Sequence, residues 1–193
     1  MKTTIRTLLY AALCAAAAKG AAITITETQL GIGSLDGTAF NNLMVTITVT
    51  GDTSAIVSPA PGVLDIFGTA TVSVATLGTD TFTDSIGAFV NNNIAVAGIS
   101  DFTVGGAIVD TSNAAFATYP FTTSIGPFSS SPEGNPGDSF ATLGGSFTLS
   151  TGSNADHPST FTATVAATAP EPGTIVLCAA GIGMVLITRR RRK

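Results

Sequence analysis

Apolar and hydroxyl-bearing residues alternate with a period of two along much of the chain. The pattern is clearest in four segments: Ile23–Thr26, Val45–Thr50, Ala70–Val74 and Phe161–Val165. Successive side chains of a β-strand point to opposite faces, so each segment predicts a strand with one apolar face and one face of Thr and Ser. Between residues 23 and 163 no window has the 3.6-residue period of an amphipathic helix.

Shorter runs of the same kind fill the sequence between these segments. They are Val63–Phe67, Thr79–Thr83, Ile86–Val90, Ile94–Ile99, Ile108–Asp110, Ala114–Phe121, Phe140–Leu143 and Ser146–Leu149. Turn-forming residues such as Leu35-Asp36-Gly37 separate the runs. The pattern predicts an all-β fold over residues 23–163, an antiparallel β-sandwich of jelly-roll-like or immunoglobulin-like type. Ser124 to Ser139, rich in Ser, Pro and Gly, is expected to be one long surface loop.

Charge is distributed unevenly along the chain. Ile23–Ala169 contains eleven acidic residues and neither Lys nor Arg, while all eight basic residues lie in the two ends. A segment without cations cannot neutralise phosphates, which argues against nucleic-acid binding. Because Lys is not available to protect strand edges, we expect acids in or beside the strands to take this role: Asp65, Asp80, Asp84, Asp101 and Asp110.

The N-terminal end has the composition of a secretory signal peptide. Lys2 and Arg6 precede an apolar run of eleven residues, which is too short to span a bilayer by the ~20 residues that a helix needs. Small residues follow, and we expect a signal peptide over residues 1–22, with Gly20, Ala21 and Ala22 before the cut made by signal peptidase. Cleavage two residues earlier, between Gly20 and Ala21, is the alternative.

The C-terminal end combines three features over residues 170–193, after a short stalk at residues 164–169. Pro170, Glu171 and Pro172 come first, and the two prolines favour an extended backbone. An apolar run over residues 173–188 follows; as a transmembrane helix it covers about 24 Å of the ~30 Å hydrocarbon core. Five cations end the chain: Arg189, Arg190, Arg191, Arg192 and Lys193. They are expected to stay cytoplasmic, which places residues 23–169 beyond the inner membrane.

This order of Pro-Glu-Pro, short apolar helix and Arg-rich end resembles the PEP-CTERM sorting signal. The resemblance covers only residues 170–193. It implies that Pro170, Glu171 and Pro172 are recognised by exosortase, a membrane protease that cuts near the motif and removes the apolar tail. It also implies a bacterial surface setting, often with exopolysaccharide, and nothing about the chemistry of residues 23–169. A plain membrane anchor that is never cut is the alternative.

Residues that carry chemistry are few between the two ends. Cys14 and Cys178 lie in the apolar end segments, which leaves the exported part without disulfide, thiol nucleophile or cysteine–metal site. The single histidine, His157, directly follows Asp156, and adjacent residues do not readily orient each other as in a catalytic triad. Asp80 and Asp84 have the spacing of two residues on one strand face, but no Trp accompanies them for sugar stacking. No catalytic residue is therefore predicted.

Metal binding depends on contacts that the sequence does not fix. No EF-hand loop is present, and a structural Ca²⁺ would require aspartates distant in sequence to converge in space. The aspartates concerned are Asp36, Asp52, Asp80, Asp84, Asp101 and Asp110. No metal site is assigned.

Threonine is abundant, with 26 of the 147 residues between Ile23 and Ala169. Thr-x-Thr pairs resemble ice-binding faces, but such faces need strands in register, and the pairs are irregularly spaced along the chain. Tyr119 is the one Tyr or Trp available for stacking on a sugar in this span. We therefore expect a non-enzymatic protein of the cell surface or extracellular matrix, structural or adhesive in an exopolysaccharide context. A carbohydrate-binding module is the alternative, and a hydrolase comes third.

Overall fold

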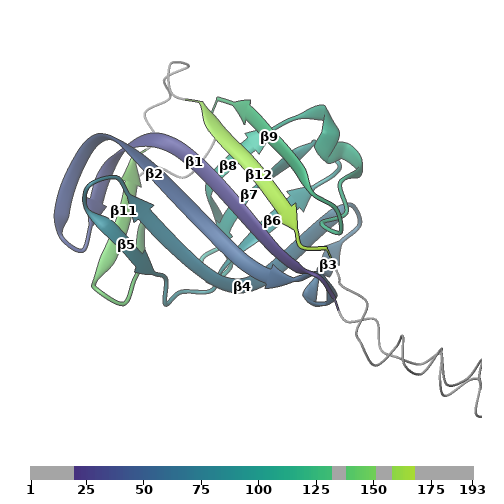
Figure 1. The fold of residues 1–193 in the computed structure, drawn as a ribbon, viewed down its shortest axis with the longest axis horizontal. Helices are drawn as coiled ribbons and strands as arrows, with labels where there is room; N and C mark the ends of the chain where they lie inside the picture. The colour runs from purple at the N-terminus through teal and green to yellow at the C-terminus, as the bar shows by residue number, and fades with distance from the viewer. Residues whose placement is uncertain (1–19, 132–137, 151–157, 168–193) are drawn as a thin grey trace, which may run out of the picture. The chain divides into compact units, whose positions relative to one another are not determined.

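The computed structural model describes residues 20–131, 138–150 and 158–167. Its compact unit, Gly20–Ala166, contains twelve strands, and the described residues form no α-helix (Figure 1). The strands are β1 (Ala22–Leu35), β2 (Thr38–Asp52), β3 (Val57–Ala60), β4 (Val63–Val74), β5 (Gly78–Thr81), β6 (Ile86–Asn91), β7 (Val96–Asp101), β8 (Gly106–Ser112), β9 (Ile125–Ser130), β10 (Ser139–Ala141), β11 (Ser146–Ser150) and β12 (Ser159–Val165). The prediction of an all-β, antiparallel fold is confirmed. The expected signal and C-terminal helices lie outside the described residues. Among the residues that are described, no helix is long and apolar enough to cross a membrane.

The strands form one curled sheet rather than the two separate sheets of a sandwich. The main path runs β10-β11-β1-β2-β4-β6-β7-β8, with β12 beside β1, β9 beside β12, and β3 and β5 beside β4. The cause is the length of β1, β2 and β4, which span 14, 15 and 12 residues. Each half of β1 has its own neighbour: Ile23–Thr28 pairs with β12, and Ile32–Leu35 pairs with β11. The sheet can therefore curl around both ends of the same long strands.

Contacts between distant strands close both curls. At one end, Phe82 forms a β-bridge with Thr142, which joins the chain after β5 to the end of β10. At the other end, β8 lies against β12 and β9: Ser159 Oγ donates to the Asp110 carbonyl at 2.8 Å, and the Ser112 amide donates to Ser130 Oγ at 2.9 Å. In Figure 1, β9, β12, β1, β2 and β4 lie side by side at the front of the view.

One apolar core fills the inside of the sheet and contains two aromatic groups. Phe147 contacts Phe40, Phe82 and Phe140 with ring centroids 6.0–6.4 Å apart. Phe116 stacks edge-on against Phe161 at 5.1 Å in the other curl. Burial of side chains of this size contributes about 1.5–3 kcal/mol each, so these groups replace the ion pairs that the sequence cannot form.

Two segments differ from their predicted structure. Ala114–Phe121, predicted as a strand, contains the 3-10 helix η2 (Ala114–Thr118), because the Asn113 side chain accepts a hydrogen bond from the Ala115 amide and caps it. The predicted loop over residues 124–139 contains β9. Pro127 is tolerated there because β9 is hydrogen-bonded to a strand on one side only, β12, with a register shift.

Candidate functional site

A buried carboxyl group lies inside the sheet, on β1. Glu27 follows Ile23 and Ile25 in the inward series of this strand and is 1% exposed. Its cross-strand neighbours are Ile47 on β2 and Phe161 on β12, so both flanks are apolar. Burial raises the pKa of Glu27 well above its usual value; the Thr111 hydrogen bond lowers it in part, and the charge of Asp110 raises it further.

Hydrogen bonds link Glu27 to β8 and β12 in a chain of oxygen atoms. Glu27 Oε1 lies 2.7 Å from Thr111 Oγ1, which lies 2.7 Å from Ser159 Oγ, which in turn lies 2.8 Å from the Asp110 carbonyl oxygen. Thr111 Oγ1 donates to Glu27 Oε1, and Ser159 Oγ donates to the Asp110 carbonyl. Burial of the Glu27 carboxyl outweighs the Thr111 hydrogen bond and favours the neutral form of the group, as its raised pKa indicates.

Gln29, two residues further along the same face of β1, is also buried, at 3% exposure. Among the described residues, its two amide atoms and Glu27 Oε2 have no hydrogen-bond partner. The sequence analysis did not single out either residue. The signal was present, because the alternation that buries Ile23 and Ile25 also places positions 27 and 29 on the inner face.

The other carboxylates mainly form turns and hold strands together. Asp80 accepts from the amides of Thr81 and Gly144, which lower its pKa, and Asp84 accepts from the Ala141 amide. Asp36, the third acid at this end, accepts from the Thr142 hydroxyl at 2.8 Å. The structure thus brings together two of the six aspartates considered for Ca²⁺, Asp36 and Asp80, through their shared neighbour Gly144. Within the described residues, no three His, Cys, Asp or Glu side chains are close enough to hold a metal ion.

Two of the aspartates expected to protect strand edges are instead buried. Asp65 on β4 is 6% exposed, and Asp101 at the end of β7 is 3% exposed. Burial raises the pKa of Asp65, and Asp101 accepts from the Thr103 amide at 2.6 Å. The prediction was wrong for both, because sequence spacing does not distinguish an acid at an exposed edge from one that the fold buries.

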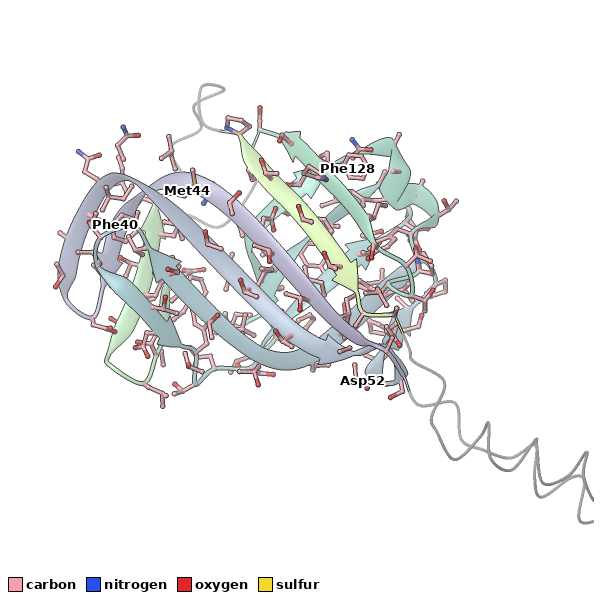
Figure 2. All side chains as sticks on the ribbon, in the orientation of Figure 1. Phe40, Met44, Asp52 and Phe128 are labelled. Atoms are coloured by element: carbon pink, nitrogen blue, oxygen red, sulfur yellow. The ribbon has the colours of Figure 1, made fainter. Side chains whose placement is uncertain are left out.

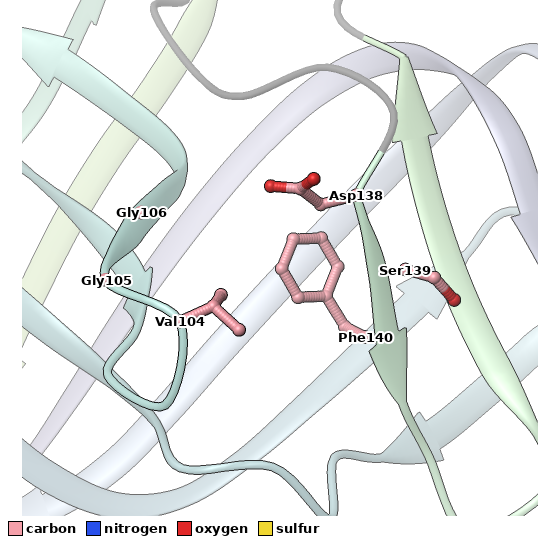
Figure 3. Close-up of a pocket in the computed structure, with 6 residues that line it drawn as sticks. All are labelled: Val104, Gly105, Gly106, Asp138, Ser139 and Phe140. Carbon is pink, nitrogen blue, oxygen red and sulfur yellow. The ribbon is translucent and has the colours of Figure 1, made fainter.

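A pocket with a volume of about 190 Å³ lies between the β7–β8 turn and the start of β10. Figure 3 shows Val104 and Phe140 facing each other across it, with Asp138 nearby. Among the described residues that line this pocket, Asp138 is the one ionisable side chain. The pair of carboxyl groups that glycoside hydrolysis needs is therefore not found among them.

The outward residues of six strands form rows of hydroxyl groups in register. The first row is Thr164–Thr24–Thr50–Thr69, the second is Thr162–Thr26–Thr48–Thr71–Thr81, and the third is Ser129–Thr160–Thr28–Thr46–Ser73–Thr79. We call these three rows the outer hydroxyl face; they cross β12, β1, β2 and β4 and reach β9 and β5. Figure 2 shows oxygen-tipped side chains along β2 between the labelled Met44 and Asp52. The sequence argument against a regular arrangement was wrong, because strand pairing aligns threonines whose spacing along the chain is irregular.

A pair of aromatic rings, one exposed and one half-buried, lies at the end of these rows. Phe67, 39% exposed, continues the outward series of Thr69 and Thr71 on β4. Its ring centroid lies 4.7 Å from that of Phe102, and both rings lie over Gly87, where a Cβ atom would meet them at 3.0–3.4 Å. Tyr119, the ring considered for sugar stacking, is buried, and its hydroxyl donates to the Thr123 carbonyl.

At the N-terminal boundary, Gly20, Ala21 and Ala22 belong to the folded unit. The Ala21 amide donates to Thr53 Oγ1 at 2.8 Å, its carbonyl accepts from the Thr53 amide, and the Ala22 carbonyl accepts from the Ala166 amide. Cleavage before Ile23 would remove these contacts, whereas cleavage before Ala21 would keep them. The contacts thus favour the alternative cleavage site.

The residues of the C-terminal signal lie outside the described part of the chain. They are Pro170, Glu171, Pro172 and the cations Arg189, Arg190, Arg191, Arg192 and Lys193. Residues 168–193 match the family model of the PEP-CTERM protein-sorting motif. The tail is a PEP-CTERM sorting signal. This signal implies processing by exosortase, a membrane protease, and export with membrane-associated sorting toward the cell surface. No curated protein and no solved structure matches the chain.

Proposed function

We propose that this chain is an exported, non-enzymatic protein of the cell surface or extracellular matrix, structural or adhesive in an exopolysaccharide setting. The PEP-CTERM signal at residues 168–193 carries the proposal, because it directs the folded unit toward the surface. The described acids support a structural role: Asp36, Asp80 and Asp84 hold turns and strands together. In this proposal, exosortase removes the tail after signal peptidase has removed the N-terminal segment.

The intact mass of the protein recovered from the producing cells and their medium tests this proposal. We expect a C-terminus near Pro170–Pro172, and added mass in hexose steps would indicate a glycosylated matrix component. A Pro170→Ala/Pro172→Ala variant is expected to keep the basic tail, while a Pro132→Ala/Pro136→Ala variant, which removes two prolines elsewhere, is processed normally. A wild-type protein that still carries Arg189–Lys193 would contradict sorting by cleavage and leave a plain membrane anchor.

Carbohydrate binding is the second candidate function. The outer hydroxyl face and the Phe67–Phe102 pair, of which Phe67 is exposed, favour it, since together they present polar and apolar groups to the same side of β4.

A further inference from the structure

We propose that the outer hydroxyl face, together with Phe67 and Phe102, binds a neutral polysaccharide chain. The inference rests on the proposed function of a surface or matrix protein and names its partner and its binding face. Four observations carry it: available hydroxyls, their regular spacing, the lack of charge in the rows and the adjoining aromatic pair.

The hydroxyls of the first two rows are available to a ligand. Within the described part of the chain, the side-chain hydrogen bonds of the face all lie in the third row: Ser129 Oγ with Thr160 Oγ1 at 2.8 Å, Thr79 Oγ1 with Ser73 Oγ at 3.0 Å, and Ser73 Oγ with the Gly78 carbonyl at 3.4 Å. Each free threonine hydroxyl can donate one hydrogen bond and accept two. A sugar hydroxyl has the same capacity, so either partner can act as donor.

Strand geometry sets the spacing of the rows. Neighbouring strands lie about 4.8 Å apart, and outward residues on one strand repeat about every 6.7 Å. A single hydrogen bond to a sugar replaces a hydrogen bond to water, so it contributes little binding free energy. A polymer with a repeating unit meets this array at many points at once, and the later contacts form at high effective concentration. The array therefore suits a polymer better than a free sugar.

Charge favours a neutral polymer over an acidic one. The three rows contain Thr and Ser alone and so carry no ionisable group. Ile23–Ala169 has eleven acids and no Lys or Arg, which leaves an anionic chain without a cationic partner and under net repulsion. Phe67 and Phe102 add an apolar surface beside Thr69, on which the C–H face of a sugar ring can pack out of water.

The shape of the sheet also favours a polysaccharide over an ice lattice as the binding partner. The rows lie on a sheet that curls far enough to bring β8 against β12. A rigid planar lattice cannot follow such a surface over several strands, whereas a polysaccharide can bend around its glycosidic bonds. We therefore assign the face to a flexible chain.

Native electrophoresis in gels that contain dextran, hydroxyethylcellulose or polygalacturonate tests the proposal with the mature protein. Retardation is expected in at least one neutral gel and not in polygalacturonate. The variant Thr26→Val/Thr48→Val/Thr71→Val keeps the β-branched shape and removes the centre of the second row; we expect at least about tenfold weaker binding. The matched variant Thr26→Ser/Thr48→Ser/Thr71→Ser keeps the hydroxyls and should bind within about threefold of wild type.

Phe67→Ala provides a second variant, on the edge of the face, and is expected to weaken binding at least about threefold. Far-UV circular dichroism establishes that each variant is folded. Wild-type migration unchanged by both neutral polymers, equal binding by the valine variant, or equal retardation in polygalacturonate would overturn the proposal. So would valine-sensitive inhibition of ice growth without retardation. The intact-mass experiment is independent of these results, so a failure here leaves the sorting proposal standing.

Discussion

Replacing Glu27 with Gln tests whether the fold holds a proton on this carboxyl group. Gln has the same shape and does not titrate, and its side-chain carbonyl oxygen can accept a hydrogen bond from Thr111 Oγ1 as Glu27 Oε1 does. The pKa of Glu27 in the unfolded chain is about 4.5, and in the fold it is raised well above this value. The folded state therefore binds more protons than the unfolded state between these two values, and its stability falls as pH rises.

The upper limit of the slope is about 1.4 kcal/mol per pH unit, the free energy of one proton held by the fold and released on unfolding. Wild-type protein should therefore lose more unfolding free energy than Glu27→Gln as pH rises from 5 to 6, by at most about 1.4 kcal/mol, because the pKa of Glu27 is raised in the fold. Asp65, whose pKa is also raised, is present in both proteins, so its contribution cancels in the difference. Urea unfolding followed by far-UV circular dichroism measures the free energy, since the chain has no Trp for fluorescence.

Asp52→Asn is the matched control. Hydrogen bonds from Ser54 lower the pKa of Asp52 below 3.8, so this group is ionised in both states at pH 5 and pH 6. Its replacement should leave the wild-type slope in that interval unchanged. Parallel pH profiles for wild type and Glu27→Gln would refute the reasoning and show that Glu27 is ionised in the fold or that the chain of oxygen atoms does not form.

Three further results are expected. Thr111→Val breaks the middle of that chain and should cost about 1–3 kcal/mol of unfolding free energy, because it leaves Glu27 Oε1 without a partner, while Ser159 Oγ keeps its bond to the Asp110 carbonyl. Thr111→Ser should cost less than about 1 kcal/mol, and denaturant titration compares the two. N-terminal sequencing of the mature protein should give Ala21, and a start at Ile23 would contradict the contacts of residues 20–22. Trypsin should produce no fragment by cleavage within Ile23–Ala169 even in urea, since the segment has no Lys or Arg, and mass spectrometry of the digest detects any exception.

Local pattern was enough to predict the strands with strict alternation and the first turn. The Asp36-Gly37 pair joins β1 to β2 in a two-residue turn, and φ is +51° and +80° at the two positions. These values fit the type I′ turn that Asp-Gly favours, whose twist matches that of the paired strands. The fold class follows from such elements because alternation and turn chemistry act within a few residues of each other.

Closure of the sheet could not be predicted in the same way. The bridge between Phe82 and Thr142 joins positions far apart in the sequence, and no local pattern specifies it. The same holds for the outer hydroxyl face, since the register of β1 with both β2 and β12 aligns Thr26 with Thr48 and Thr162. Sequence shows that each strand has a hydroxyl-bearing face, and only pairing shows that the faces join.

The buried polar groups could be predicted from the sequence only in part. Alternation placed Glu27 and Gln29 on the inner face, but the hydrogen bonds of Glu27 come from β8 and β12, whose positions beside it depend on closure. An acid at an inward position of an apolar series is thus a signal that sequence reasoning can use. What satisfies that acid is set by the tertiary structure.

Closure also explains how a unit without Lys avoids pairing through its strand edges. Asp65 and Asp101 are buried, so they do not guard edges. Instead, the Phe82–Thr142 bridge and the contacts of β8 with β9 and β12 cover most edges by folding the sheet onto itself. β3 pairs with β4 alone, and it is four residues long and contains Pro59, two features that limit pairing with another chain. Protection by closure leaves the acids free to shape turns and leaves the outer face to neutral hydroxyls, which is the property that the proposed polysaccharide contact requires.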